Sequence, residues 1–366
     1  FCKSKCFYCS FSSFAGMQSL HGRYCTALQK EIRTHHRKQQ GTPLATLFIG
    51  GGTPTVLRAK QLSEIIDMCD QVYGFEPDAE ISIEANPGTI DVADLQILRD
   101  SGLNRISFGI QSFLEQDLLE LDRAHNSAEG MRAVENARHA GFDNISLDLM
   151  YGLPSQSPEA WQQNLEQAFT CEPEHLSLYQ LTIEKETEFY RRLQKNQLAL
   201  PDEDAIVEMD EVTELLCEKH AFSRYEISNY AKPGFRCRHN LVYWHNEEYL
   251  ACGAGAVGYA EGIRSKSVED PLSYCVKIEQ EKDVIVQREK LDCEASFRES
   301  VVIGLRLVKG VSEHRLFERY GISLAEVYGT HLPKLVQGGF LEYSHGYLRL
   351  TPRGFRVANT VMAELV

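Results

Sequence analysis

The chain has 366 residues, of which 43% are hydrophobic and 25% are charged, so it is long enough to form two globular domains. Its 38 basic and 52 acidic residues give a net charge of −14. This balance argues against nucleic acid as a partner, because phosphate binding requires a basic surface. No apolar run approaches the length of a membrane-spanning helix.

The first two-thirds of the sequence alternates short apolar runs with helical patterns. This alternation predicts a parallel sheet with helical crossovers, and the strands are apolar almost throughout, as expected when both faces are covered. The predicted strands cover residues 44–49, 79–85, 104–110, 143–150 and 175–183. The predicted helices cover residues 59–73, 91–101 and 158–170, with further helical segments up to about 140 and up to about 219.

The sequence changes character after about residue 220. Residues 221–294 are aromatic and turn-rich and include a glycine-rich loop at 253–262, whereas residues 295–366 are helical again. Near the end, VSEHRLFERYG and LAEVYGTHLPKLVQGG predict two helices, FLEYSHGYLRLT predicts a hairpin, and a last helix follows. This order is winged-helix-like, but with only Lys334 as an obvious basic residue on the second helix it favours docking over DNA binding. We expect three domains: 1–220, 221–294 and 295–366.

Eleven cysteines, an odd number, are scattered along the chain, and most of them stand alone in apolar stretches. This distribution indicates small buried hydrophobic residues in a reducing, cytoplasmic compartment and not a disulfide framework.

Three cysteines open the chain with the spacing C-x3-C-x2-C: Cys2, Cys6 and Cys9. Thiolates this close can hold an iron–sulfur cluster or most of a zinc site. A structural zinc ion requires four protein ligands, and the nearest spare candidates, His21 and Cys25, stand at no familiar zinc spacing. A four-iron cluster with one iron left open is therefore favoured, with zinc as the alternative.

This spacing, with the aromatic Tyr8 before the last cysteine, resembles the radical S-adenosylmethionine (SAM) enzymes. Members of that superfamily place a first barrel strand just before the motif. The resemblance therefore implies an α/β fold, a partial (β/α)6 barrel whose first strand is missing from the given chain. In barrels of this type the functional residues lie at the carboxyl ends of the strands.

Polar and glycine residues follow one predicted strand after another. Each of them singly could be a helix cap or part of a structural salt bridge. Asp148 lies inside an apolar run, where an unpartnered carboxylate would be costly, and Arg123 suits the carboxylate of SAM. The resemblance implies that the following residues line the SAM site: Tyr8, Gly51, Gly52, Thr53, Glu84, Gln111, Arg123, Asp148 and Thr182.

The combination of IGGGTPT, ISIEANPGT, FGIQSF, LDLMYGLP, YEISNYAKPG and CRHNLVYW resembles the family of oxygen-independent coproporphyrinogen III oxidase, and within it the HemW-like heme chaperones. The oxidases usually carry a fourth cysteine where this chain has Phe11. The chaperone pattern HN-x-x-YW is present as His239, Asn240, Tyr243 and Trp244. One departure is Val257, which stands where chaperone relatives often have a histidine, so no role of that histidine carries over.

The resemblance implies a protein with a [4Fe-4S] cluster and SAM that binds heme and passes it to an acceptor, which could be membrane-bound. His239 is the candidate heme ligand and Cys237 the second candidate; the alternative for His239 is a structural histidine. A coproporphyrinogen-decarboxylating enzyme is the alternative function, so enzymatic activity stays open. The resemblance is compatible with a cytoplasmic protein, with one peripheral to the inner face of a membrane, and with a homodimer.

Overall fold

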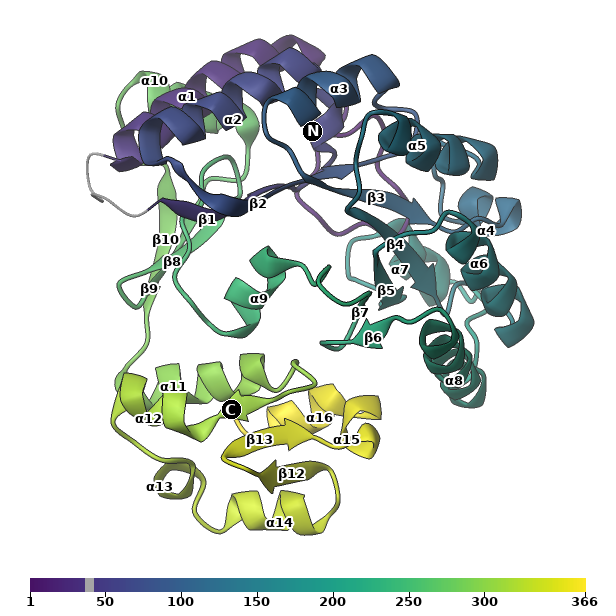
Figure 1. The fold of residues 1–366 in the computed structure, drawn as a ribbon, viewed down its shortest axis with the longest axis vertical. Coiled ribbons are helices and arrows are strands. Elements are labelled where there is room, and N and C mark those ends of the chain that lie inside the picture. Colours follow the sequence, from purple (N-terminus) through teal and green to yellow (C-terminus); the bar gives the residue numbers. More distant parts are fainter. Residues whose placement is uncertain (37–42) are drawn as a thin grey trace. The chain divides into compact units, whose positions relative to one another are not determined.

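A computed structural model describes residues 1–36 and 43–366 (Figure 1). The chain divides into two compact units. Unit 1 consists of Phe1–Ser223, Ser228–Arg236 and Pro271–Lys282, and unit 2 consists of Arg224–Ile227, Cys237–Asp270 and Asp283–Val366. The domain boundaries expected at 220 and 294 remain predictions. Within the described residues, no helix is long and apolar enough to cross a membrane.

The sheet of unit 1 has the order β1-β2-β3-β4-β5-β7-β6, and β1 to β5 run parallel to one another. Strand β7 pairs antiparallel with β5, which the sequence did not predict. The strands are β1 (Leu44–Ile49), β2 (Phe75–Ala85), β3 (Arg105–Gln111), β4 (Ile145–Tyr151), β5 (His175–Gln180), β6 (Ser223–Arg224) and β7 (Asn229–Ala231). The expected partial α/β barrel of mostly parallel strands is confirmed.

Most helices of unit 1 follow strands of the sheet and cover its outer face (Figure 1). They are α1 (His21–His36), α2 (Ala59–Tyr73), α3 (Val92–Asp100), α4 (Glu115–Glu120), α5 (Ser127–His139), α6 (Pro158–Thr170), α7 (Glu188–Gln194), α8 (Glu203–Lys219) and α10 (Pro271–Glu279). Short 3-10 turns cover Gln18–Leu20 and Pro54–Val56. Helices α2 and α6 have the predicted bounds, and α1 was not predicted. Helix starts follow capping chemistry, as where Asn126 accepts from the backbone N–H of Glu129 and that glutamate bonds back.

The two faces of the sheet differ in polarity because strand side chains alternate. The face under the helices carries buried apolar residues such as Ile83, Ile106 and Leu147, which pack against helix residues in one core. On the opposite face the register brings polar residues side by side on neighbouring strands, Glu84 beside Ser107 and Asp148 beside Ser177. The apolar core thus fixes a sheet whose other face can hold polar chemistry.

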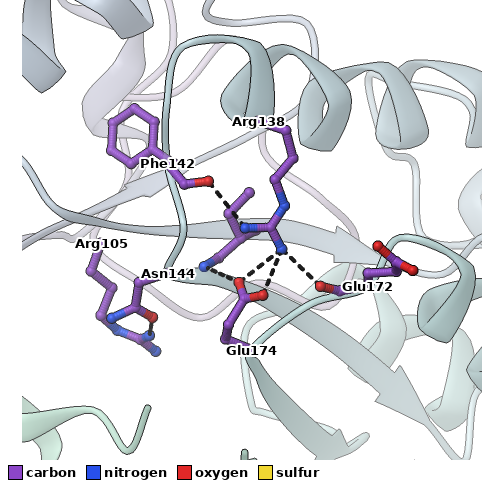
Figure 2. Close-up of polar contacts among 7 residues, drawn as sticks. Arg105, Arg138, Phe142, Asn144, Glu172 and Glu174 are labelled. Carbon is purple, nitrogen blue, oxygen red and sulfur yellow. Dashed lines mark hydrogen bonds and ion pairs between the residues drawn. The ribbon is translucent and has the colours of Figure 1, made fainter. Parts of the chain in front are cut away.

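The amino ends of the strands are tied together by Arg138 of α5 (Figure 2). Its Nη2 donates to both carboxylate oxygens of Glu174 at 2.8 Å and to the carbonyl of Glu172 at 2.7 Å. Glu174 Oε2 also accepts from the backbone N–H of Ile145, at the start of β4, at 3.0 Å. Beside this network, Arg105 donates to Asn144 at 3.1 Å. These bonds hold the ends of β3 to β5 that lie away from the candidate site.

Unit 2 holds two small antiparallel sheets and short helices. Its elements are α9 (Arg238–Trp244), β8 (Val257–Ala260), β9 (Ile263–Ser267), β10 (Ile285–Lys290), α11 (Cys293–Gly304), β11 (Val311–Ser312), α12 (Glu313–Tyr320), α13 (Leu324–Tyr328), α14 (His331–Gln337), β12 (Leu341–Ser344), β13 (Tyr347–Leu350), α15 (Pro352–Arg356) and α16 (Ala358–Ala363). The helical C-terminal region and its hairpin are as predicted.

Three local predictions in unit 2 were wrong. Part of the expected glycine-rich loop is strand β8, because Tyr259 and its neighbours pair with β9. The second predicted helix is split into α13 and α14 at Gly329, whose φ of 47° ends the first piece. The last predicted helix is likewise two helices, separated at Val357.

Candidate functional site

The opening loop brings the three predicted cluster cysteines to the end of the sheet where β1 finishes. Cys2, Cys6 and Cys9 are free, half-buried thiols. The backbone N–H of Cys9 donates to the carbonyl of Cys6 at 3.1 Å, which closes a tight turn between them. Cys2 Sγ lies 3.5 Å from the hydroxyl oxygen of Thr53.

Three thiolates from one loop suit a [4Fe-4S] cluster, in which each ligand binds a different iron. Among residues 1–36 and 43–366, no three His, Cys, Asp or Glu side chains converge as a single metal ion would require. A four-iron cluster does not need that convergence. Hydrogen-bond donors reach two of the sulfurs, since Arg123 Nη1 lies 3.4 Å from Cys6 Sγ and the Thr53 hydroxyl lies beside Cys2. The three cysteine thiols and the hydrogen-bond donors beside them therefore fit a [4Fe-4S] cluster.

The glycine turn after β1 contacts the start of the cysteine loop. The backbone N–H of Thr53 donates to the carbonyl of Phe1 at 2.7 Å. A Cβ on Gly52 would lie 2.5 Å from that carbonyl oxygen and 3.0 Å from Cys2 Sγ, so only glycine permits this approach. Gly51 has a φ of 119°, and its N–H donates to Glu84 Oε2 at 3.0 Å. The turn thus joins the cysteine loop to the end of β2.

Two carboxylates face each other across the polar side of the sheet. Burial, together with the negative charge of Asp148, raises the pKa of Glu84 to about 7. Burial also raises the pKa of Asp148, although hydrogen bonds from Ser177 and Ser107 oppose it; the Ser107 bond is 2.9 Å long. Two such acceptors could receive hydrogen bonds from a pair of ligand hydroxyl groups, such as those of a ribose.

Arg123 lies in the middle of the site. Its guanidinium donates to Cys6 Sγ, to Asn86 Oδ1 at 2.7 Å and to the carbonyl oxygen of Gly109. Its Nε is buried and has no hydrogen-bond partner within the described residues. Tyr8 bonds to the same guanidinium, although burial is the larger influence and raises the pKa of its phenol. The structure therefore brings Arg123, Tyr8 and Cys6 together.

Asn86 belongs to this group, and the sequence analysis missed it. Its Nδ2 donates to Thr53 Oγ1 at 2.8 Å while its Oδ1 accepts from Arg123. It directly follows β2, in ANPG, so its position one residue beyond a strand end was the signal that could have found it.

The last two predicted SAM residues differ in their surroundings. Gln111 ends β3 with a φ of 67°, a left-handed conformation that is costly for a residue other than glycine and that is typical of functional sites. Thr182 lies two residues beyond β5 and is exposed. Its role stays a prediction.

A cavity of about 160 Å³ lies beside the cysteine loop within unit 1. Its walls include Cys6, Thr53, Asn86, Arg123 and His125. Burial, together with the positive charge of Arg123, lowers the pKa of His125 to about 4. The cavity wall is therefore polar, and its histidine is neutral at physiological pH.

The candidate heme ligands belong to unit 2. His239 lies in the first turn of α9 and is half-buried, whereas Cys237, the residue before that helix, is buried at 1% exposure. His239 Nε2 is hydrogen-bonded to the Tyr243 hydroxyl at 2.8 Å, and the ring of Tyr243 meets that of Tyr249 edge to face. His239 is therefore the more accessible of the two candidates.

The end of α9 is held by charged and amide groups of unit 2. The guanidinium of Arg306 lies over the Trp244 ring, 4.4 Å from its centre, and 3.8 Å from the carboxylate of Glu226, which is fully buried. Just after the helix, Asn246 donates to Ser300 at 2.9 Å. The helix that carries His239 thus has a fixed C-terminal end.

The chain is similar to known protein families, to individual proteins and to solved structures. The model of the Radical SAM superfamily matches residues 1–168, and the HemN C-terminal domain matches residues 291–357. The protein named heme chaperone HemW in Bacillus subtilis (strain 168) is 38% identical over 100% of this chain and 97% of its own length. The Escherichia coli (strain K12) protein of the same name is 34% identical over 99% and 94%.

Among solved structures, one reported as coproporphyrinogen III oxidase (HemN) from Escherichia coli superposes with a TM-score of 0.86. It covers 100% of this chain and 88% of its own, at 20% sequence identity. At that identity the likeness shows a common fold and nothing more.

Proposed function

This chain belongs to the HemW family of radical SAM proteins, and from that membership we propose that it is a heme-binding chaperone with a [4Fe-4S] cluster and SAM, delivering heme to heme-requiring enzymes. The observation that carries the proposal is the full-length identity of 38% to a protein named as a heme chaperone. Phe11, where the oxidases usually carry a cysteine, favours the chaperone over the oxidase.

Cys2, Cys6 and Cys9 would hold the cluster in this proposal. When bound, a cluster of this kind with SAM supplies one-electron reductive chemistry, and the protein provides position and a dry environment. The Gly51–Thr53 turn would approach the amino-acid end of SAM through its backbone, and Arg123 would face its carboxylate. Glu84 and Asp148 would accept from the ribose hydroxyls, with Tyr8, Gln111 and Thr182 completing the site.

His239 would ligate the heme iron. Two observations support it: the imidazole is half-buried, and it stands on a helix whose C-terminal end is held. A neutral imidazole is also a common axial ligand. Cys237 is the second candidate, but its burial at 1% exposure means that the chain around it would have to move before iron could reach it. We therefore rank His239 first.

The acceptor in this proposal is a membrane-bound heme enzyme, met from the cytoplasmic side by a peripheral protein. The name of the relatives, heme chaperone, supports delivery of heme to a partner protein. Cell fractionation tests the location: protein released from membranes by salt alone supports a peripheral association, and protein that needs detergent contradicts it.

A heme titration followed at the Soret band tests the proposed function. The protein is first reconstituted anaerobically with its cluster, and the titration is repeated with His239→Ala. Saturation near one heme per chain, with an altered spectrum in the variant, supports both the chaperone and the ligand. Saturable binding with an unaltered spectrum in the variant keeps the chaperone and rejects His239. Lack of specific binding rejects the chaperone, and a SAM-dependent assay for porphyrinogen decarboxylation then follows.

A further inference from the structure

A chain of hydrogen bonds joins two of the opening cysteines through the side chain of Asn86. From Cys2 Sγ it runs 3.5 Å to the Thr53 hydroxyl, and Asn86 Nδ2 donates to that hydroxyl at 2.8 Å. From Asn86 Oδ1 it runs 2.7 Å to Arg123 Nη2, and Arg123 Nη1 lies 3.4 Å from Cys6 Sγ. We propose that Asn86 is a positioning residue that sets the reduction potential of the cluster and orients Arg123 for SAM.

This inference rests on the cluster assignment in the proposed function and concerns Asn86, to which that function gives no role. Asn86 supplies a donor on one side and an acceptor on the other, a combination that only an amide side chain offers at this length. The space around it fits that purpose. A Cβ on Gly109 would lie 2.7 Å from Asn86 Oδ1 and 3.4 Å from Arg123 Nη2, so the glycine leaves room for the pair.

The direction of each bond follows from the chemistry of its partners. Because Asn86 Nδ2 already donates to the Thr53 oxygen, the proton of the Thr53 hydroxyl is available to the sulfur of Cys2. On the other side, Arg123 can only donate, so Cys6 Sγ accepts from it. Both ends of the chain therefore direct an N–H or O–H group at a cysteine sulfur.

Hydrogen bonds to the sulfurs of an iron–sulfur cluster stabilise its reduced, more negative state and so raise its potential. Removing the side chain of Asn86 would loosen both donors together. Arg123 Nη2 would keep its bond to the Gly109 carbonyl but lose its bond to Asn86 Oδ1, so the guanidinium that also donates from Nη1 to Cys6 would be held less firmly. We therefore expect a lower potential and weaker SAM binding from one change.

The local backbone does not depend on the Asn86 side chain. The turn after β2 is closed by the backbone carbonyl of Asn86, which accepts from the N–H of Thr89 at 3.2 Å and from its hydroxyl at 2.6 Å. A change confined to the amide group leaves those bonds in place. A purely structural role of Asn86 would thus give a change in stability without a change in potential.

The test compares Asn86→Ala and Asn86→Asp with wild-type protein, each reconstituted with iron and sulfide. The matched control is Asn104→Ala, because Asn104 also makes two bonds through its amide, to Ile81 N–H at 2.9 Å and Ala79 O at 2.7 Å, next to the start of β3. Three quantities are measured: iron and sulfide content, the potential by EPR-monitored redox titration, and the dissociation constant of SAM by equilibrium dialysis.

For Asn86→Ala we expect full iron content, a lower potential and roughly tenfold weaker SAM binding, the loss typical of a charged group deprived of one hydrogen bond. Asn104→Ala should leave the potential and the SAM constant unchanged. Asn86→Asp keeps an oxygen facing Arg123 but adds negative charge, so it should keep SAM affinity near wild type while still lowering the potential.

Wild-type potentials in both Asn86 variants, with full iron content, would overturn the inference. If Asn86→Ala does not fold, Asn86→Asp alone decides: a potential equal to that of wild type rejects the role. Lack of iron in the wild-type protein is a different failure, since it would reject the cluster assignment itself.

Discussion

His239 Nε2 lies 2.8 Å from the hydroxyl oxygen of Tyr243, one turn further along α9, and the two rings meet edge to face. The nitrogen that usually ligates iron in a surface-accessible histidine is therefore engaged before heme arrives. Heme iron can bind Nε2 only after this hydrogen bond has broken.

Tyr243→Phe should therefore strengthen heme binding if Nε2 is the ligating atom. Loss of one neutral hydrogen bond, worth about 1 kcal/mol, predicts a dissociation constant for heme several-fold lower than that of wild type. Heme titration at the Soret band measures this dissociation constant. Tyr249→Phe is the control, because it removes a hydroxyl from the ring that meets Tyr243 edge to face. Weaker binding in Tyr243→Phe would mean that the hydroxyl helps to hold heme. It would contradict the expectation that the hydroxyl and the heme iron compete for His239 Nε2.

Cys6→Ser should abolish cluster loading, because a neutral hydroxyl cannot replace a thiolate on iron and the Arg123 donor then faces no sulfur. Iron and sulfide analysis after anaerobic reconstitution measures this. Cys293→Ser, on an exposed cysteine of α11, is the control and should load fully. A full iron complement in Cys6→Ser would exclude Cys6 from the ligand set.

Glu84→Gln should change how stability depends on pH. Burial raises the pKa of Glu84 to about 7, so the folded protein binds this proton more tightly than the unfolded chain does. Its stabilising contribution is fully present below about pH 4.5 and is lost as the pH rises through 7. The variant lacks that loss, so relative to wild type it should gain on the order of 2 kcal/mol between pH 5 and pH 8.

Urea unfolding of the apo protein at the two pH values measures this difference. Glu166→Gln, on the exposed side of α6, serves as the control for removing one glutamate charge at the surface. An equal stability difference for Glu84→Gln at pH 5 and pH 8 would mean that Glu84 titrates normally.

Gly52→Ala should destabilise the apo protein by about 1–3 kcal/mol, the usual cost of overpacking, because its Cβ would lie 2.5 Å from the Phe1 carbonyl oxygen. It should also reduce iron loading, since the same atom would lie 3.0 Å from Cys2 Sγ. Gly22→Ala is the matched control: it lies in helix α1, a Cβ there meets nothing within 4 Å, and a gain in stability is expected. Chemical denaturation and iron analysis of both variants measure these effects. Wild-type stability and iron content in Gly52→Ala would show that the turn adjusts to the added Cβ.

The alternation of apolar strands and helical segments was enough to predict the parallel sheet of unit 1. Strand β1 and helices α2 and α6 lie where the sequence predicted them, because turn residues and caps such as Ser157 mark their ends locally. Helix α1 was not predicted, because its largely polar sequence, HGRYCTALQKEIRTHH, offers few apolar residues to mark a helical face. In the last part of the chain, the helical periodicity of the sequence did not reveal that a helix ends at Gly329.

The sequence by itself determined which family this protein resembles and which chemistry that family implies. The features that carry the resemblance are local in the chain: the cysteine spacing, a glycine turn after a strand and polar residues at successive strand ends. Only the tertiary structure decided which of these residues meet. Asn86 had no predicted role, yet β1, β2 and β3 bring Thr53, Asn86 and the Gly109 carbonyl together, and Arg123 bonds to both Asn86 and that carbonyl. Such contacts join residues tens of positions apart, and they form only when burial of the apolar face fixes the strands in register.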